Sequence, residues 1–205
     1  MMNSLWIAKT GMTAQQTNLD VISHNLSNVS TTGFKRNFAV FQDLMYQNQR
    51  QVGAQTGDNT QLPTGLHVGL GVNVGSISRN FMQGALTNTG NALDIAINGQ
   101  GFFQVQMPDG TIGYTRDGTF KLDDQGQLVT SQGFLVDPQI TVPQGAKSIS
   151  VSKDGIVSVV LPGQTQPQQI GQMQLADFIN PQGLEPIGGN LYLETAASGA
   201  PTVAN

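Results

Sequence analysis

The residue types that most often carry out catalysis or bind metals are few and scattered along this 205-residue chain. It has two histidines, His24 and His67, and no cysteine, so neither a three-histidine zinc site nor a cysteine nucleophile can form. Glu185 and Glu194 are the only glutamates. A glycosidase-type carboxylate pair would need an aspartate such as Asp177, and nothing in the spacing places such a pair in one cleft. We therefore predict no enzyme activity, no metal site and no cofactor.

Two Gly-x-Gly pairs and one acidic turn are the remaining candidates for ligand binding. The pairs at 69–71 and 99–101 lack the third glycine and the following helix of a nucleotide-binding loop, so we interpret both as tight turns. The run 123–126 begins like a calcium loop but has no glutamate at its twelfth position. We interpret it as a solvated turn and expect no small-molecule substrate.

Charge and hydropathy exclude further classes of partner. Charged residues make up 11% of the chain, well below the usual level of about 25%, and the basic residues are scattered, so no nucleic-acid partner is expected. No apolar run is long enough for a membrane helix. The N-terminus has no basic start, continuous apolar centre or small-residue cleavage site, so no cleavable signal peptide is expected. A low charge density suits a surface that lies mostly between subunits.

The element with the clearest pattern is a long amphipathic helix within residues 1–36. Apolar side chains recur every seven residues, with a second row three positions further on, which is the a/d pattern of a coiled coil. The candidate subunit-interface residues are Leu5, Met12, Leu19, Ile22, Leu26 and Val29. An ordinary amphipathic helix docked on its own domain has the same stripe. No later segment is long enough to pair with the helix, so we expect its partner to lie outside the chain and the isolated helix to lack a complete core.

The helix ends in a run of Asn, Ser and Thr, whose side chains compete with helical hydrogen bonds. Gly33 can then adopt the positive φ that reverses the chain. We expect a turn built from Asn25, Asn28, Thr32, Gly33 and Phe34.

After the helix, the chain is predicted to be mainly β. Residues 37–90 form a connecting segment: a short helix or a strand fits 37–49, and the polar, Gly-rich stretch 47–65 is typical of a flexible loop. Alternating apolar residues and closely spaced turn signals at Asp109-Gly110 and Asp154-Gly155 predict a compact antiparallel β domain at 91–180 with type I′ hairpins. Residues 181–205 read as a return strand and a linker-like tail. The predicted fold class is therefore mainly β, with a long N-terminal helix and an extended polar loop.

The helix and its end closely resemble the N-terminal signature of flagellar rod and hook proteins. The resemblance rests on the run from Gly11 to Arg36 and extends to three later motifs: Asn98-Gly99-Gln100-Gly101-Phe102-Phe103, Tyr114-Thr115-Arg116-Asp117-Gly118-Thr119-Phe120 and Gly189-Asn190-Leu191-Tyr192. Family members continue past a tail like 195–205 into a C-terminal helix that this sequence does not contain. We expect either a truncated chain or a helix supplied by another chain.

The resemblance implies a structural subunit of the bacterial flagellar distal rod, which assembles helically into the shaft that carries torque from motor to hook. The implied partners are copies of itself, proximal rod and hook or hook-junction proteins, the surrounding ring proteins and the flagellar export apparatus. The implied location is the rod in the periplasm, reached without a signal peptide, and the implied role of 47–65 is to pack between subunits, loose in the monomer and ordered in the rod. Two alternatives remain: another axial protein of the proximal rod or hook, or a secreted β-rich binding module.

Overall fold

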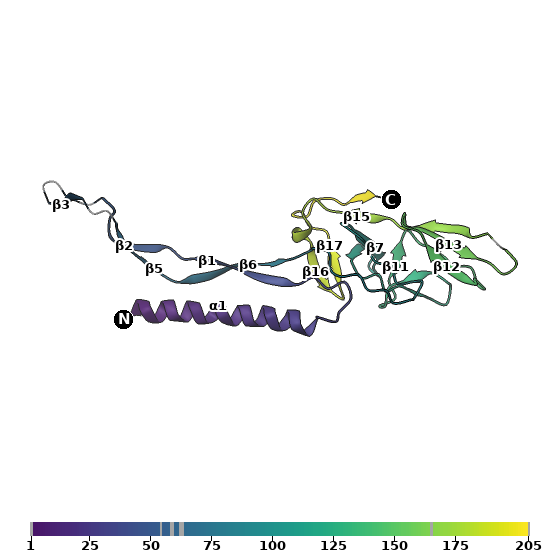
Figure 1. Ribbon diagram of the computed structural model, residues 1–205, viewed down its shortest axis with the longest axis horizontal. Coiled ribbons are helices and arrows are strands. Elements are labelled where there is room, and N and C mark those ends of the chain that lie inside the picture. The colour runs from purple at the N-terminus through teal and green to yellow at the C-terminus, as the bar shows by residue number, and fades with distance from the viewer. Residues whose placement is uncertain (1, 54, 58–59, 62–63, 165, 205) are drawn as a thin grey trace. The chain divides into compact units, whose positions relative to one another are not determined.

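The computed structural model describes residues 2–53, 55–57, 60–61, 64–164 and 166–204. Its contacts divide the chain into two units. The first comprises Met1–Val29 and Arg36–Asn80, and the second comprises Ser30–Lys35 and Phe81–Asn205. One long helix and otherwise antiparallel strands (Figure 1) confirm the predicted fold class.

In the first unit, the helix α1 (Met2–Ser27) lies along a two-stranded antiparallel ribbon of β1 (Asn37–Asp43) and β6 (Val72–Arg79) (Figure 1). One face of α1 therefore packs on the chain itself, which was not predicted, whereas the apolar stripe that was predicted to need a partner stays exposed. Ala14 and Val21 are buried, and these small side chains let the helix approach the ribbon closely. The strand, and not the helix, is the correct reading of residues 37–43, because β-branched and aromatic side chains suit a pleated, half-buried surface.

The described residues of the polar stretch 47–65 include strand segments, which its composition did not predict. Here β2 (Tyr46–Arg50) pairs with β5 (Leu66–Gly69), and β3 (Gln55–Gly57) pairs with β4 (Thr60–Gln61). Every residue of β2 is exposed, so main-chain ladder bonds, and not apolar burial, define these strands. Ala54, Asp58, Asn59, Leu62 and Pro63 lie outside the described residues. The expectation that the stretch is loose in the monomer stays a prediction.

The second unit contains a nine-stranded sheet and a three-stranded sheet, both antiparallel. The large sheet consists of β7 (Phe102–Gln106), β8 (Ile112–Thr115), β9 (Lys121–Leu122), β10 (Leu128–Val129), β11 (Leu135–Asp137), β15 (Leu175–Asp177), β16 (Glu185–Gly188), β17 (Leu191–Leu193) and β18 (Thr202–Ala204). The small sheet consists of β12 (Ser148–Val151), β13 (Ile156–Val160) and β14 (Gln168–Gln172). A short 3-10 helix, Pro181–Gly183, precedes β16.

Strand β7 supplies both hydrophobic cores of the second unit, because successive side chains on a strand point to opposite faces. Phe103 belongs to a core that includes Phe120 and Val157. Phe102 belongs to a second core with Tyr114 and Tyr192. Both phenylalanines are almost fully buried, which fixes the register of the central strand.

The sequence predicted a linker-like tail after residue 194. The described residues of this tail instead belong to the second unit. Thr202–Ala204 pair with β15 as β18. Ser198 is buried and its hydroxyl donates to the carbonyl oxygen of Thr195 at 2.9 Å. This turn returns the chain to the sheet, so the β domain extends beyond the predicted limit of residue 180.

The Asp-Gly hairpins at 109–110 and 154–155 form where they were predicted, but with a different turn. Gly110 and Gly155 have positive φ, whereas among the described non-glycine residues only Asn190 does. Gly110 donates to the carbonyl oxygen of Met107, and the Met107 N–H donates to Thr111. This is the pattern of a type I turn followed by a left-handed glycine, which is used by three-residue hairpin loops.

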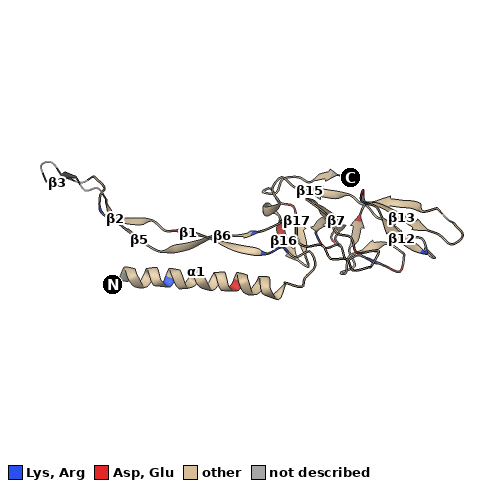
Figure 2. Ribbon diagram, in the orientation of Figure 1, with Lys and Arg blue, Asp and Glu red and all other residues tan. Residues whose placement is uncertain are grey.

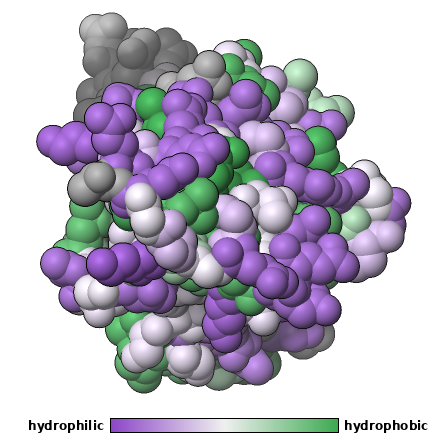
Figure 3. All heavy atoms as spheres, turned by 90° about the vertical axis from the view of Figure 1, so that its right-hand side faces the viewer, coloured by the Kyte–Doolittle hydropathy of each residue, from purple (hydrophilic) through white to green (hydrophobic). Residues whose placement is uncertain are grey.

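The end of the second unit that carries β12 and β13 has a mixed surface. Figure 3 shows mainly hydrophilic residues there, with hydrophobic ones in small separate groups. Such scattered apolar side chains are normal for a protein surface.

Candidate functional site

The apolar stripe predicted on α1 is exposed along the length of the helix. We call it the seam: Leu5, Met12, Leu19, Ile22, Leu26 and Val29, each between 52% and 75% exposed. Side chains seven residues apart lie on one face of a helix. The structure therefore places Leu5, Met12, Leu19, Ile22 and Leu26 on one face of α1, with Val29 in the turn that follows the helix, and the described part of the chain leaves all six exposed.

The opposite face of α1 packs on the ribbon through a second seven-residue row. Its members are Ile7, Ala14 and Val21, which are half-buried or buried. Sequence reasoning missed this row because alanine and the threonines and glycine beside it carry little hydrophobic signal. The signal that could have found it is the repeat of small or β-branched residues on the face opposite the seam.

Close packing of α1 on β6 depends on Thr10 and Gly71. The Thr10 hydroxyl donates to the carbonyl oxygen of Ile7 at 2.8 Å and accepts from the N–H of Val72 at 3.4 Å. Gly71 has a φ of +123°, and a Cβ there would overlap the Thr10 hydroxyl. Glycine is therefore required where the ribbon passes this point of the helix.

The end of α1 is held by asparagine side chains. Asn25 donates to the carbonyl oxygen of Asn37 at 2.7 Å and accepts from its N–H at 2.9 Å. Asn28 donates through both its backbone N–H and its side-chain amide to the carbonyl oxygen of His24. These bonds satisfy groups that a helix end and a strand start would leave without partners.

The signature turn divides between the two units. Asn25 and Asn28 belong to the first unit, whereas Thr32, Gly33 and Phe34 belong to the second. The turn itself closes locally, with the N–H of Phe34 donating to the carbonyl oxygen of Thr31 at 3.3 Å. The five predicted turn residues therefore come from both units.

Residues 32 and 33 dock on the loop that follows β8. Gly33 has a φ of +73°, and a Cβ there would lie 2.8 Å from the backbone nitrogen of Asp117. The side chain of Asn190 donates to the carbonyl oxygen of Thr32 at 2.8 Å. Sequence reasoning did not single out Asn190 for this contact, although it lies in one of the motifs that carry the resemblance.

The loop beneath Gly33 is itself tightly constrained. The Asp117 carboxylate accepts from the N–H of Thr119 at 3.1 Å and from its hydroxyl at 2.8 Å. A Cβ on Gly118 would overlap the carbonyl oxygen of Ile95. The motif from Tyr114 to Phe120 therefore forms a rigid platform for the signature turn.

Lys35 and Arg116 are two half-buried or buried cations beside this platform. The Lys35 ammonium donates to the carbonyl oxygen of Met82 at 2.9 Å, and Arg116 Nη1 donates to that of Gly99 at 2.8 Å. Burial, and secondarily the charge of Arg116, lower the pKa of Lys35. Burial also lowers the pKa of Arg116, whose guanidinium stacks on Phe102 at 5.2 Å. Each cation therefore links two chain segments through a hydrogen bond to a backbone carbonyl oxygen.

The remaining chemical candidates are turns. Asp123 accepts from the N–H groups of Gln125 and Gln127 at 2.9 and 2.7 Å, and Gly99 and Gly101 have φ values of +115° and +116°. Over the described ranges, no group of three or more His, Asp or Glu side chains is placed to hold a metal ion. Across the same residues, no helix has the length and hydropathy to cross a bilayer.

Charge is sparse on the helix that carries the seam. Lys9 is its only lysine or arginine and Asp20 its only acidic residue (Figure 2). Interface cores are depleted in charged side chains. A long helix with two charges and an exposed apolar stripe has the composition of an assembly surface.

Two family models match the chain. The model of the flagella basal body rod protein matches residues 5–35, which include most of α1 and the signature turn. The model of the flagellar hook protein FlgE/F/G D1 domain matches residues 96–159, within the second unit.

Curated relatives match over nearly the whole chain. The flagellar basal-body rod protein FlgG of Buchnera aphidicola subsp. Schizaphis graminum is 55% identical over 201 residues, which cover 98% of this chain and 77% of the relative. FlgG of Caulobacter vibrioides is 52% identical over 204 residues, 99% of this chain and 78% of the relative. The flagellar hook protein FlgE of Helicobacter mustelae is 42% identical over 137 residues, 66% of this chain and 30% of the relative.

Proposed function

The chain belongs to the family of flagellar rod and hook proteins and is a structural subunit of the flagellar rod, and from this premise we propose that copies of it assemble helically through the seam of α1 into the distal rod. The observation that carries the proposal is the exposure of all six seam residues. Contacts between unlike surfaces that do not close into a ring generate a filament. The seam provides one such surface.

The free energy that burial of the seam side chains would contribute supports a role in assembly. Full burial of a Val, Leu, Ile or Met side chain contributes about 1.5–3 kcal/mol, so six would contribute on the order of 10 kcal/mol. Association costs about 4–15 kcal/mol in lost freedom. Burial of the seam could therefore offset much of the free-energy cost of association, with other contacts supplying the rest.

In the rod, the proposed role is mechanical. Stacked copies form a shaft that transmits torque from the motor to the hook, with α1 in the inner layer and the second unit facing the surrounding rings. Its further proposed partners are proximal rod proteins, hook or hook-junction proteins and the export apparatus. The proposed location is the rod in the periplasm, reached through the flagellar export channel without a cleaved signal peptide.

Complementation tests this function. A strain that lacks its own distal rod protein is given this chain, or this chain extended by the C-terminal quarter of a relative, since the chain spans 77% of such a relative. We expect the protein in purified basal bodies and restored swimming in at least one of the two strains. Export into the medium without incorporation in both strains would favour a secreted binding module instead. Incorporation into hooks alone would favour the other axial assignment.

A further inference from the structure

Two segments of the second unit carry every main-chain connection to the first unit. Ser30–Lys35 belongs to the second unit and links α1 to β1, which both belong to the first. The chain returns to the second unit at residue 81, directly after Asn80 of the first. We call Ser30–Lys35 and residues 81–83 the connecting segments. A force that passes between the units along the main chain therefore passes through these segments.

A side chain joins the two connecting segments just beyond the ladder of the β1–β6 ribbon. In the first unit, β1 and β6 pair along their length, and the Asn80 N–H donates to the carbonyl oxygen of Arg36 at 3.0 Å. In the second unit, the Lys35 ammonium donates to the carbonyl oxygen of Met82 at 2.9 Å. We call this second bond the clamp. It connects by a side chain the same two strands of chain that main-chain bonds connect in the ribbon.

Both connecting segments also rest on one support within the second unit. The side chain of Asn190 donates to the carbonyl oxygen of Thr32 at 2.8 Å. The Phe81 ring meets the rings of Phe102 and Tyr192 edge-on, with centres 5.7 and 5.8 Å apart, a favourable arrangement for aromatic pairs. Because Asn190 and Tyr192 are two residues apart, the start of β17 holds one segment by a hydrogen bond and the other by packing.

The clamp places a charged group where charge is costly. Lys35 is 9% exposed, and burial, followed by the charge of Arg116, lowers the pKa of Lys35. A methionine has nearly the same length and would avoid the cost of burying an ammonium. It would also leave the Met82 carbonyl oxygen without this donor, and hydrogen bonds from charged donors are stronger than neutral ones. The bond, and not packing, therefore explains a lysine at this position.

We infer that Lys35 is a positioning residue whose bond to Met82 holds the connecting segments together, so that torque crosses the subunit through two joined segments. The inference rests on the proposed function, because it specifies how a rod subunit carries force between its units. Joined segments bend together, whereas separate segments bend independently. Without the clamp, residues 81–83 should detach from Ser30–Lys35 more often, while the cores of the second unit stay folded.

Limited proteolysis of the full chain with chymotrypsin tests the clamp, with products cut at residues 81–83 quantified by mass spectrometry. The cleavage rate follows the population of the detached segment when reattachment is fast. Lys35→Met keeps the length of the side chain and removes the donor, so cleavage there should be about tenfold faster or more. Lys153→Met makes the same change at an exposed lysine between β12 and β13 and should not alter the rate. Unchanged cleavage of Lys35→Met would overturn the inference.

A chemical rescue separates the ammonium from the shape of the side chain, and the absence of native cysteine makes it specific. Lys35→Cys is alkylated while unfolded, with 2-bromoethylamine or with 1-bromopropane, and then refolded. Both products have about the length of lysine, but only the first ends in an ammonium. The aminoethyl product should be cleaved as slowly as the unchanged protein, and the propyl product as fast as Lys35→Met. Equal rates, or refolding of the aminoethyl product alone, would overturn a local clamp.

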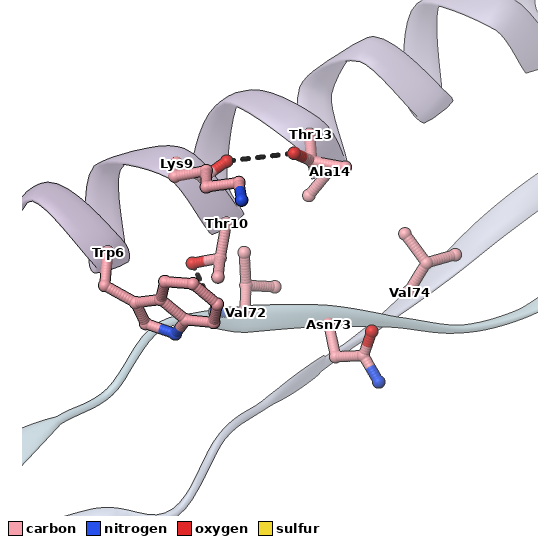
Figure 4. A pocket seen from close by; sticks show the side chains of 8 residues that line it. All are labelled: Trp6, Lys9, Thr10, Thr13, Ala14, Val72, Asn73 and Val74. Carbon is pink, nitrogen blue, oxygen red and sulfur yellow. Dashed lines mark hydrogen bonds between the residues drawn. The ribbon is translucent and has the colours of Figure 1, made fainter.

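The first unit serves as an internal control. Trp6 lies beside Val72 of β6 (Figure 4), so its fluorescence reports the packing of α1 on the ribbon. This fluorescence should be the same in the unchanged protein, in Lys35→Met and in both alkylated products. A change in Lys35→Met would show that the substitution disturbs the first unit, and would contradict a role confined to the connecting segments.

Swimming tests the mechanical role. Cells with Lys35→Met should contain the subunit in purified basal bodies but swim more slowly than cells with Lys153→Met in a viscous medium. Equal swimming would overturn the role of the clamp in carrying torque. Failure of the unchanged chain to enter basal bodies, with or without the C-terminal extension, would instead overturn the proposed function, whereas the cleavage assay tests the clamp in the isolated protein.

Discussion

The side-chain amide of Asn25 makes both hydrogen bonds that an adjacent strand residue would make to Asn37. Its nitrogen donates to the Asn37 carbonyl oxygen at 2.7 Å, and its oxygen accepts from the Asn37 N–H at 2.9 Å. One residue in the last turns of α1 therefore fixes the first residue of β1, although a turn of the chain separates them. The amide sets where the helix ends and where the ribbon begins.

Replacing Asn25 with Ala should destabilise the first unit by about 1–3 kcal/mol, because the main chain of half-buried Asn37 loses both partners. Urea unfolding followed by Trp6 fluorescence measures this, since Trp6 is the single tryptophan and lies in the first unit. Asn25→Asp keeps the acceptor but sets a carboxylate oxygen against the Asn37 carbonyl oxygen, so it should also be less stable than the unchanged protein. An Asn25→Ala variant as stable as the surface control Gln16→Ala would show that the bond pair is not stabilising.

Gly33→Ala should destabilise the second unit more than Gly110→Ala does. Both glycines have positive φ, so both substitutions carry a left-handed penalty of about 1–2 kcal/mol. Only Gly33 also faces backbone, with Asp117 nitrogen 2.8 Å from the new Cβ, whereas nothing lies within 4 Å at Gly110. Denaturant unfolding followed by circular dichroism measures the difference. Equal losses would show that the turn is not held against the Asp117 loop.

Tyr114 should make the second unit less stable as the pH rises from 10 to about 12. Burial, together with the carboxylate of Glu194 at 3.5 Å, raises the pKa of Tyr114 from 10.0 to about 12. The folded state then keeps a proton that the unfolded state releases, so the stabilisation is complete below pH 10 and is lost through this window. In Tyr114→Phe this loss should disappear. Unfolding titrations of both proteins across the window measure it, and parallel profiles would contradict the assignment.

Much of the fold could be predicted from residue patterns within single segments of the sequence. The seven-residue repeat from Leu5 to Leu26 predicts α1, and alternating residues such as Ile149 and Val151 predict the strands. The pairing of β2 with β5 could not be predicted, because exposed polar strands are specified by main-chain bonds and not by burial. The role of the tail was not predicted for a related reason. Ser198 is small and polar, yet it is buried because local hydrogen bonds satisfy it.

The sequence predicted the exposed seam of α1 but not the buried face by which the helix packs on the ribbon. Large apolar residues such as Leu19 mark the seam in the sequence, and the structure exposes them. Ala14 and Thr10, which attach the helix to the ribbon, have little hydropathy signal. The contact between Gly33 and Asp117 joins residues far apart in the chain, so no local pattern could reveal it.

The most direct test of the account is incorporation of Leu19→Asp into rods. A buried seam cannot accept an unpaired carboxylate, so this variant should be exported and folded but absent from purified basal bodies, and the cells should not swim. Asp20→Lys changes a charge at an exposed position of α1 that is not three or four residues from any seam residue, and it should incorporate normally. Val21→Asp, on the buried face, should instead unfold the first unit, as judged by Trp6 fluorescence. Normal incorporation and swimming with Leu19→Asp would contradict the assignment of the seam as the assembly surface.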